Sequence, residues 1–347
     1  MIFLENLHRG KQSILFPHMP SIHSYAAVVG KKESDGPLSE YFDHTSQDTY
    51  FGQKTWEKAE NRMQQLALQT ALEKGRLQSS DLDVVFSGDL LNQCIGSSFS
   101  LRETGIPSLG LYGACSTMSE GLLLAAAGVA AGYARRAAAL TSSHFASSER
   151  QYRAPLGYGA QRTPTAQWTV TGAGCMILDR SGAGPYIESA TVGCIRDLGI
   201  KDAANMGAAM APAALDTLAC HFRDLNRKPS DYDLIVTGDL GQIGKQIVLE
   251  LGKQDGLELS AQYDDCGCMI FDQKRQDVHA GGSGCGCSAV VLCGYLMRLF
   301  QQKKLHRLLF CGTGALLSPT STFQGESIPG VCHAVSICSE RSPSWNI

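Results

Sequence analysis

Apolar residues recur every three to four positions in two long stretches of this chain, and a short apolar run follows each stretch. The recurrence places small and apolar side chains on one face, which predicts two amphipathic helices. These side chains are Met63, Leu66, Ala67, Thr70 and Ala71 in the first stretch and Leu215, Leu218, Ala219 and Phe222 in the second. The runs that follow predict buried strands, because they are rich in β-branched residues and bounded by turn signals. Strands that alternate with helices indicate α/β layers with mainly parallel sheets.

The two predicted strands belong to an internal repeat. Residues 81–90 read DLDVVFSGDL, and residues 231–240, 150 positions later, read DYDLIVTGDL. A turn of small residues, an apolar helix and another strand follow each copy. A duplication of this kind constrains the fold and the site together. We therefore expect two similar halves that superpose with Asp89 and Asp239 at equivalent strand ends.

The end of the first half is predicted from a further pair of strands. Residues 174–179 and 186–195 read as consecutive strands, which we expect to pair in antiparallel fashion. The boundary between the halves is then expected near residue 195. Two domains also fit the length of 347 residues, at which a single core usually stops growing.

Composition excludes several classes of protein. Hydrophobic residues make up 44% of the chain and charged residues 18%, which fits a globular protein with a large core. The net charge of -3 comes without a basic block, so no nucleic-acid partner is expected. Thirteen cysteines without a secretion signal favour a reducing compartment. The longest nearly apolar stretch, residues 121–134, is too short to span a bilayer, although attachment to a membrane surface through a partner stays open.

Cys115 lies where a nucleophilic cysteine would be expected. Thr117 and Glu120 have the spacing of a capping box, which would place Cys115 at the start of a helix. Unpaired amides and the helix dipole favour a thiolate at such a position. The alternative is a small buried cysteine at a tight turn.

Four segments resemble the thiolase and ketoacyl-synthase superfamily. They are residues 113–116 around Cys115, 171–175 without the usual aspartate, the glycine-rich turn 278–284, and the last strand and turn 311–315. The resemblance implies a thiolase-like α/β fold, with two pseudo-symmetric halves in a layered α/β/α/β/α arrangement. Residues 1–195 would carry Cys115 and residues 196–347 would carry His279. It also implies a homodimer.

Longer segments resemble one family of this superfamily, that of stage V sporulation protein AD. They are residues 149–153, 158–161, 164–174 and 312–329. The resemblance implies binding of pyridine-2,6-dicarboxylic (dipicolinic) acid during its uptake into the developing spore. It implies a peripheral place at the inner membrane of the forespore or spore, beside other stage V sporulation membrane proteins. Whether calcium accompanies the acid is left open.

The resemblance makes binding a stronger expectation than catalysis. Cys115 and His279 match two catalytic positions of the superfamily, but Asp239 stands where histidine or asparagine is usual, unless Gln242 is the true occupant. An ionised aspartate only accepts hydrogen bonds and would oppose a developing oxyanion. Catalysis by Cys115 and His279 is therefore expected to be weak or vestigial. An acyl-thioester condensing enzyme or acyltransferase, and a structural scaffold of a membrane complex, remain alternatives.

A dicarboxylate requires fixed hydrogen-bond donors. The candidate ligand-binding residues are Cys115, His144, Arg153, Arg162, Asp239 and His279. For the two arginines the alternative is an ordinary surface charge, and for His144 a satisfied core histidine.

No metal site and no cofactor are expected. The pairs Cys266/Cys268 and Cys285/Cys287 lack the spacing of a zinc knuckle and read as core thiols. The turn at residues 281–284 lacks the pattern of a phosphate-binding loop.

Overall fold

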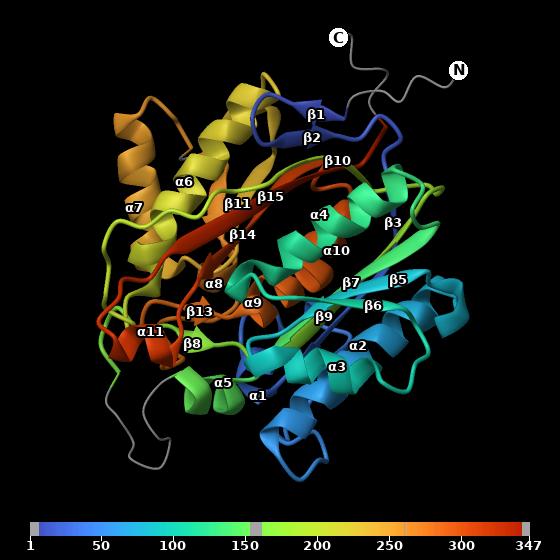
Figure 1. Cartoon of the computed structure of the whole chain (residues 1–347), viewed down its shortest axis with the longest axis horizontal. Coiled ribbons are helices and arrows are strands. Elements are labelled where there is room, and N and C mark those ends of the chain that lie inside the picture. Colours follow the sequence, from blue (N-terminus) through green and yellow to red (C-terminus); the bar gives the residue numbers. More distant parts are fainter. Residues whose placement is uncertain (1–6, 153–161, 260, 342–347) are drawn as a thin grey trace.

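The computed structural model describes residues 7–152, 162–259 and 261–341. Its main strands form two groups of five that follow the same spatial order (Figure 1). The first group runs β6 (Ser108–Leu111), β5 (Val84–Gly88), β7 (Arg136–Ser143), β9 (Gly172–Asp179) and β3 (Ser21–Val29). The second group runs β12 (Tyr263–Asp265), β11 (Leu234–Thr237), β14 (Arg307–Ala315), β15 (Gly330–Cys338) and β10 (Tyr186–Thr191). One residue pair, Tyr186 with Ser21, joins the two groups.

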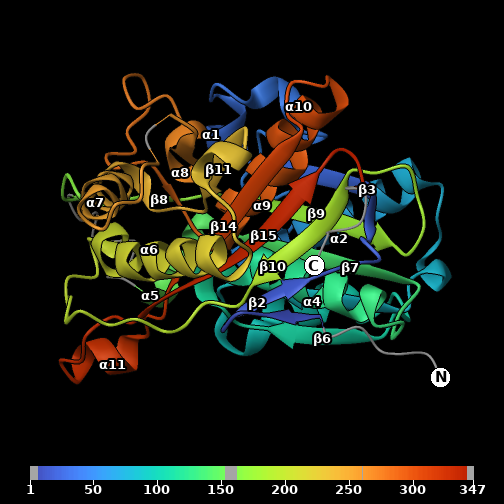
Figure 2. The same cartoon turned by 90° about the horizontal axis from the view of Figure 1, so that it is seen from above.

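The helices lie in three layers around these strands (Figures 1 and 2). The outer layers hold α2 (Trp56–Gly75) and α3 (Ile95–Leu101) on the first group, and α6 (Met206–Asp224) and α7 (Gly241–Gln254) on the second. The middle layer holds α4 (Thr117–Ala130) and α9 (Cys285–Val290), which continues through the π-helical turn Val291–Leu296 into α10 (Met297–Gln301). The expected α/β/α/β/α arrangement is therefore confirmed.

The shorter elements connect and cover these layers. The short helices are α1 (Lys31–Ser34), α5 (Phe145–Tyr152), α8 (Cys266–Met269) and α11 (Pro319–Phe323). The short strands are β1 (His8–Arg9), β2 (Ser13–Leu15), β4 (His44–Thr45), β8 (Trp168–Thr169) and β13 (Gly282–Ser283). β8 and β13 pair in parallel as a separate two-stranded ribbon.

Helix α4 shows why a nearly apolar sequence suits the middle layer. It packs against β7 and β5 of the first group and against β15 and β14 of the second. A helix covered on both faces needs apolar residues all round. By contrast, α2 covers only β3, β9 and β7, and it is apolar on one face only.

The repeated decapeptide forms the same structure in both halves. Asp83 accepts hydrogen bonds from the backbone N–H groups of Arg135 and Arg136, at 2.7 and 2.9 Å. Asp233 accepts from those of His306 and Arg307 at the same distances. β5 and β11 each lie second from the outer edge of their group, with Asp89 and Asp239 directly after them. The expected equivalence of these strand ends is confirmed.

The expected antiparallel pair of residues 174–179 and 186–195 is wrong. β9 pairs with β3 and β7, whereas β10 pairs mainly with β15 and β2. The strand order makes β10 the counterpart of β3, so the change from the first group to the second lies between Asp179 and Tyr186. This change comes earlier than the expected boundary at residue 195, because neighbours in sequence are not neighbours in the sheet here.

Among the helices that the structure describes, none is both long enough and apolar enough to cross a membrane.

Candidate functional site

Cys115 lies in the 3-10 turn Ala114–Ser116, which leads directly into α4. Ala114 has a φ of 50°, a left-handed conformation that costs a non-glycine residue roughly 1–2 kcal/mol. β14 approaches this turn so closely that a Cβ on Gly314 would lie 2.3 Å from the carbonyl oxygen of Gly113. The strained turn is therefore held between α4 and the second group of strands.

The expected capping box at this helix start does not form. Ser116 is the N-cap and makes no capping hydrogen bond through its side chain. The hydroxyl of Thr117 instead donates to the carbonyl of Ala114 at 2.7 Å. The 3-10 turn shifts the register by one position, so Thr117 is the first residue of α4 rather than its cap.

The Cys115 thiol lies against the carboxyl group of Asp239. Burial raises the pKa of the Cys115 thiol well above its usual range, and the charge of Asp239 raises it further. Contacts with the backbone of Gly284 and the hydroxyl of Ser283 act in the opposite direction but are weaker. The expectation of a thiolate is therefore wrong, because burial and a facing carboxylate outweigh the helix start.

Asp239 is fully buried and held by several donors. Its carboxylate accepts from the hydroxyl of Thr313 at 2.8 Å, the N–H of Gly284 at 2.9 Å and the hydroxyl of Ser283 at 3.3 Å. Burial raises the pKa of the Asp239 carboxyl to about 6, although these hydrogen bonds and that from Cys115 lower it. Close to neutral pH this group can therefore gain or lose a proton.

Cys115 opens into a small, mostly apolar cavity of about 40 Å³. Its other lining residues are Leu90, Tyr112, Ala114, Ser148, Glu149, Tyr152, Thr169, Met206, Ser283, Ala315 and Leu317. In the described part of the chain, the buried hydroxyl oxygen of Ser148 has no hydrogen-bond partner. It is therefore available to a ligand. A cavity of this volume holds about one to three water molecules.

His144, Arg162 and His279 are not among the described residues that line this cavity. His144 lies at the end of β7, where its Nε2 contacts the carbonyl oxygen of Thr49 at 2.8 Å. His279 Nε2 and Arg162 Nη2 both contact the carboxylate of Asp277, at 3.2 and 2.9 Å. Arg153 lies outside the described residues.

Gln242, the alternative occupant of the second catalytic position, lies in α7 and bonds to Gln273 through its side chain. Asp239 is thus the residue that faces Cys115.

Sequence reasoning missed several residues of the cavity. Glu149, Thr169 and Ser283 lie in segments that resembled known families, and Tyr112 lies directly before one, but no pattern in the sequence marks a lining residue. Ser148 carried no signal, since one serine in a run of small residues predicts nothing.

A second cleft, of about 380 Å³, lies on the other side of β8. Trp168 lines this cleft and the next residue, Thr169, lines the Cys115 cavity, because successive side chains of a strand point to opposite faces. His144 belongs to this second cleft.

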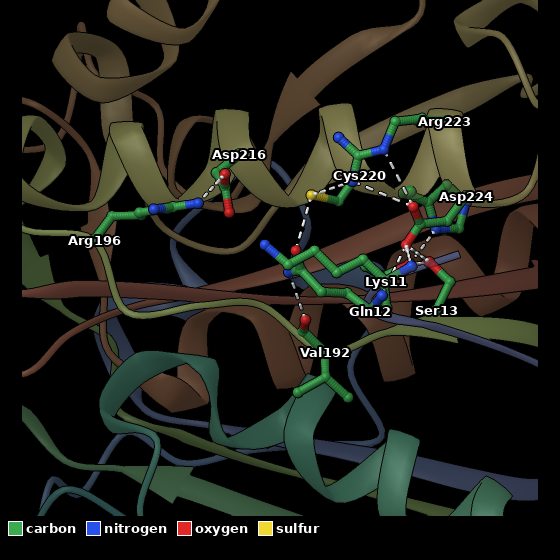
Figure 3. A network of polar contacts seen from close by, with 11 residues as sticks. Lys11, Gln12, Ser13, Val192, Arg196, Asp216, Cys220, Arg223 and Asp224 are labelled. Atoms are coloured by element: carbon green, nitrogen blue, oxygen red, sulfur yellow. Dashed lines mark hydrogen bonds and ion pairs between the residues drawn. The ribbon is translucent and has the colours of Figure 1, made fainter. Parts of the chain in front are cut away.

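A third, polar cleft lies between α6 and the hairpin of β1 and β2 (Figure 3). The Asp224 carboxylate accepts from the N–H groups of Lys11 and Gln12 at 3.0 and 2.8 Å. Arg196 pairs with Asp216 at 2.5 Å. These contacts hold the hairpin and the segment before α6 against that helix. Their role is therefore structural.

In the part of the chain that the structure describes, no three side chains of histidine, cysteine, aspartate or glutamate gather as a metal site.

Comparison with known proteins identifies the family. The model of the family described as stage V sporulation protein AD matches residues 10–338. Stage V sporulation protein AD of Bacillus subtilis (strain 168) is 46% identical over 326 residues, which cover 94% of this chain and 96% of the relative.

Solved structures support the fold alone. 3-Oxoacyl-[acyl-carrier-protein] synthase III from Aquifex aeolicus VF5 has a TM-score of 0.56 at 12% identity and covers 92% of this chain and 99% of its own. An OleA structure from Xanthomonas campestris has a TM-score of 0.57 at 14% identity and covers 93% of this chain and 99% of its own. Both are related to this chain through the thiolase-like fold.

Proposed function

Because the chain belongs to the family of stage V sporulation protein AD, we propose that it binds dipicolinic acid during uptake of this acid into the developing spore. The proposed site is the Cys115 cavity. The observation that carries the proposal is the contact of the Cys115 thiol with the buried carboxyl of Asp239, which keeps the sulfur protonated. A protonated thiol whose hydrogen is shared with Asp239 does not attack an acyl group, which favours binding over acyl transfer.

The lining of the cavity decides which form of the acid it accepts. The lining residues that the structure describes include the carboxyl of Glu149 but no lysine or arginine, and Asp239 lies behind Cys115. Such a lining repels a free dianion. It favours a ligand whose charge is reduced, either by protonation or by calcium. Titrations with and without calcium distinguish these two forms.

The cavity has to widen before it admits a six-membered ring. Tyr112 is 44% exposed and also lines the cavity, so its side chain connects the cavity to solvent. The Tyr112 hydroxyl is hydrogen-bonded to that of Tyr152, which donates to the carbonyl of Leu90. We propose that rotation of Tyr112 away from Tyr152 opens the cavity to the acid.

Calorimetry with dipicolinic acid tests the proposed site. Ser148→Ala and Cys115→Ala each remove a hydrogen-bonding group from the lining, and we expect each to weaken binding about tenfold or more. Cys220→Ala is the matched control, because Cys220 is similarly buried but lies in the polar cleft of Figure 3. Unchanged affinity in both cavity variants would show that the acid binds elsewhere.

Acyl transfer is tested separately. After incubation with acyl-CoA, mass spectrometry should find no thioester on Cys115, since the facing carboxylate opposes both the thiolate and an oxyanion. A stoichiometric acyl adduct on Cys115 would favour the condensing-enzyme alternative.

We also propose that two copies of the chain pair along β6. This strand forms one end of the first group, and no further strand pairs with its outer edge among the described residues. Large exposed side chains gather on and beside it: Leu109 and Tyr112, with Ile95 and Phe99 on α3. An unpaired, apolar edge strand is a surface for pairing with another strand.

The family membership, and not a membrane-spanning segment, supports a proposal for where the protein acts in the cell. We propose that the protein acts at the inner membrane of the forespore or spore, held there by other stage V sporulation membrane proteins. Co-purification of these proteins with the chain from forespore membranes, and its release by salt or loss of a partner, tests this proposal.

A further inference from the structure

The cleft on the far side of β8 has three aromatic walls, those of Trp56, Phe145 and Trp168. Phe145 and Trp168 stack with their ring centroids 3.8 Å apart and their planes 8° from parallel. From α5, Phe145 lines this cleft, while Ser148 and Glu149 line the Cys115 cavity. β8 and α5 therefore separate two sites with different linings.

Two cations lie close to the Trp168 ring. The ammonium nitrogen of Lys32 is 3.5 Å from the ring centroid, and the guanidinium carbon of Arg162 is 4.7 Å from it. Such contacts attract a cation to the face of an aromatic ring. Both cations also donate to the carbonyl oxygen of Asp277, each at 2.9 Å. Lys32 and Arg162 are thus held side by side.

The protein supplies little negative charge to offset this pair. The carboxylate of Asp277 binds Arg162, but its side chain is 77% exposed, so water screens its charge. Burial lowers the pKa of Lys32, and the charge of Arg162 lowers it further. The charges of Asp277 and Glu33 raise this pKa but do not outweigh the other two effects, so the two carboxyl groups compensate the ammonium charge only in part.

Two buried polar atoms beside the cleft lack partners within the described part of the chain. They are Nη1 of Arg162 and Oε2 of Glu33, and Glu33 itself lines the cleft. The other oxygen of Glu33 accepts from the N–H of Thr171 at 3.0 Å. Burial raises the pKa of Glu33 to about 7, so this carboxyl can carry a proton and offer an O–H near neutral pH. Buried polar atoms are normally paired, and an unpaired donor marks a place for a ligand acceptor.

We infer that the Trp168 cleft is a second binding site, which takes a planar aromatic carboxylate. The ring of the ligand lies against the aromatic walls, and its carboxylate binds Lys32 and Nη1 of Arg162. This inference goes beyond the proposed function, because it adds a second site of different chemistry. The Trp168 cleft has cations and aromatic walls, whereas the described lining of the Cys115 cavity includes neither lysine nor arginine. It does not depend on a ligand in the Cys115 cavity.

Calorimetry on the full chain tests the inference with three acids: pyridine-2,6-dicarboxylate, pyridine-2-carboxylate and glutarate. Glutarate carries two carboxylates without a ring, so we expect it to bind at least tenfold more weakly than the two aromatic acids. Binding of the aromatic acids should also quench tryptophan fluorescence, since Trp56 and Trp168 line the cleft. Glutarate that binds as tightly as the aromatic acids would overturn the inference and leave only a charged patch.

Two variants locate the site. Lys32→Met removes one cation and Trp168→Leu removes one ring, and we expect each to weaken binding of pyridine-2-carboxylate at least fivefold. Lys253→Met, which changes an exposed lysine on α7, is the matched control for charge. Lys32 is only half-buried, so Lys32→Met keeps the test decisive if Trp168→Leu fails to fold. Unchanged binding in folded Lys32→Met would refute the site.

Stoichiometry separates this inference from the proposed function. Two molecules of pyridine-2,6-dicarboxylate per chain are expected, one sensitive to Lys32→Met and one to Ser148→Ala. A single molecule sensitive only to Ser148→Ala overturns the second site and leaves the proposed function. A single molecule sensitive only to Lys32→Met supports the second site and rejects the Cys115 cavity.

Discussion

Asp239 and Cys115 face each other in a buried position, and their ionisation is linked. Each negative charge disfavours the other, so the pair holds at most one charge near neutral pH. The remaining contacts of Asp239, from Thr313, Ser283 and Gly284, fix the carboxylate in this orientation. Asp239 therefore keeps Cys115 as a thiol that donates a hydrogen bond, in a position where related folds have a nucleophile.

This pair predicts a pH dependence of ligand binding. An anionic acid in the Cys115 cavity opposes ionised Asp239, so its binding favours the protonated carboxyl. With a pKa of about 6 for Asp239, affinity should rise as the pH falls from 8 towards 6, by up to about tenfold per unit, and level off below 6 once the carboxyl is protonated. Calorimetry from pH 8 to 5 measures the slope.

Asp239→Asn is the control for this dependence, because the amide does not titrate and should flatten the slope. Asp265 also faces this region, and burial raises its pKa to about 7. Any slope that remains near pH 7 in the Asp239→Asn variant is therefore assigned to Asp265. An affinity of the unaltered protein that stays constant from pH 8 to 5 would count against the acid lying beside Asp239.

The helices and strands around the cavity are tied together by buried polar contacts. Glu60 of α2 accepts from the hydroxyl of Ser142 at the end of β7 and from that of Ser147 in α5, both at 2.9 Å. Asp89, after β5, accepts from the N–H and the hydroxyl of Ser97 in α3, both at 2.7 Å. Burial and, to a smaller extent, the nearby charge of Asp89 raise the pKa of Glu60 to about 8.

The raised pKa of Glu60 predicts that the fold loses stability as the pH rises from about 4.5 to about 8. A carboxyl whose pKa is higher in the folded state favours folding while it is protonated, and this contribution is lost as the pH rises from about 4.5 to 8. Glu60→Gln keeps the shape without the charge. We expect it to raise the Tm by a few degrees at pH 8 and to change it less at pH 5, as measured by calorimetric unfolding. A lower Tm for Glu60→Gln at pH 8 would contradict this account.

Asp83 and Asp233 occupy the same position in the two copies of the repeated decapeptide, so equivalent substitutions at these residues test the duplication. Asp83→Ala and Asp233→Ala each release two backbone N–H groups at the start of a strand. Because both acids are exposed and water can replace them, each change should cost about 1–2 kcal/mol of unfolding free energy. Denaturant titration should give similar losses for the two variants. Asp35→Ala, in an exposed loop after α1, is a control that should cost little.

At the scale of the whole molecule, the free edge of β6 sets the expected assembly. Leu109 is 49% exposed and Phe99 is 45% exposed, which is unusual for large apolar side chains on neighbouring elements. Tyr112, at the end of the same strand, lines the Cys115 cavity. A second copy on this edge would therefore also restrict the motion of Tyr112.

Leu109→Arg tests the proposed dimer. A charge on the edge strand blocks strand pairing, so we expect the unaltered protein to be a dimer and the variant a monomer at micromolar concentration. Sedimentation measures both. Leu198→Arg is the matched control, since Leu198 is exposed on a loop far from β6 in sequence. An unaltered protein that sediments as a monomer would reject the proposal.

The sequence by itself determined the plan of the fold and the position of the central pair. The decapeptide repeat predicted two equivalent strands, because a buried strand between two turn acids is specified by its own ten residues. Placing Cys115 at a helix start and Asp239 at a strand end needed only local patterns and the superfamily resemblance. Parallel strands have their carboxyl ends at the same edge of a sheet, so residues that directly follow such strands are expected at that edge.

Tertiary structure alone decided the charge state of Cys115 and the grouping of the other candidates. The pKa of Cys115 depends on burial by segments more than 100 residues away, which no local pattern encodes. Arg162 and His279 meet at Asp277, and His144 lies across β8 from Cys115, because the direction of each side chain depends on strand pairing. The same holds for β10, whose partner is the distant β15 rather than its neighbour in sequence. Side-chain direction and burial result from packing. The sequence could therefore identify candidate residues, but it could not predict which of them lie together in one site.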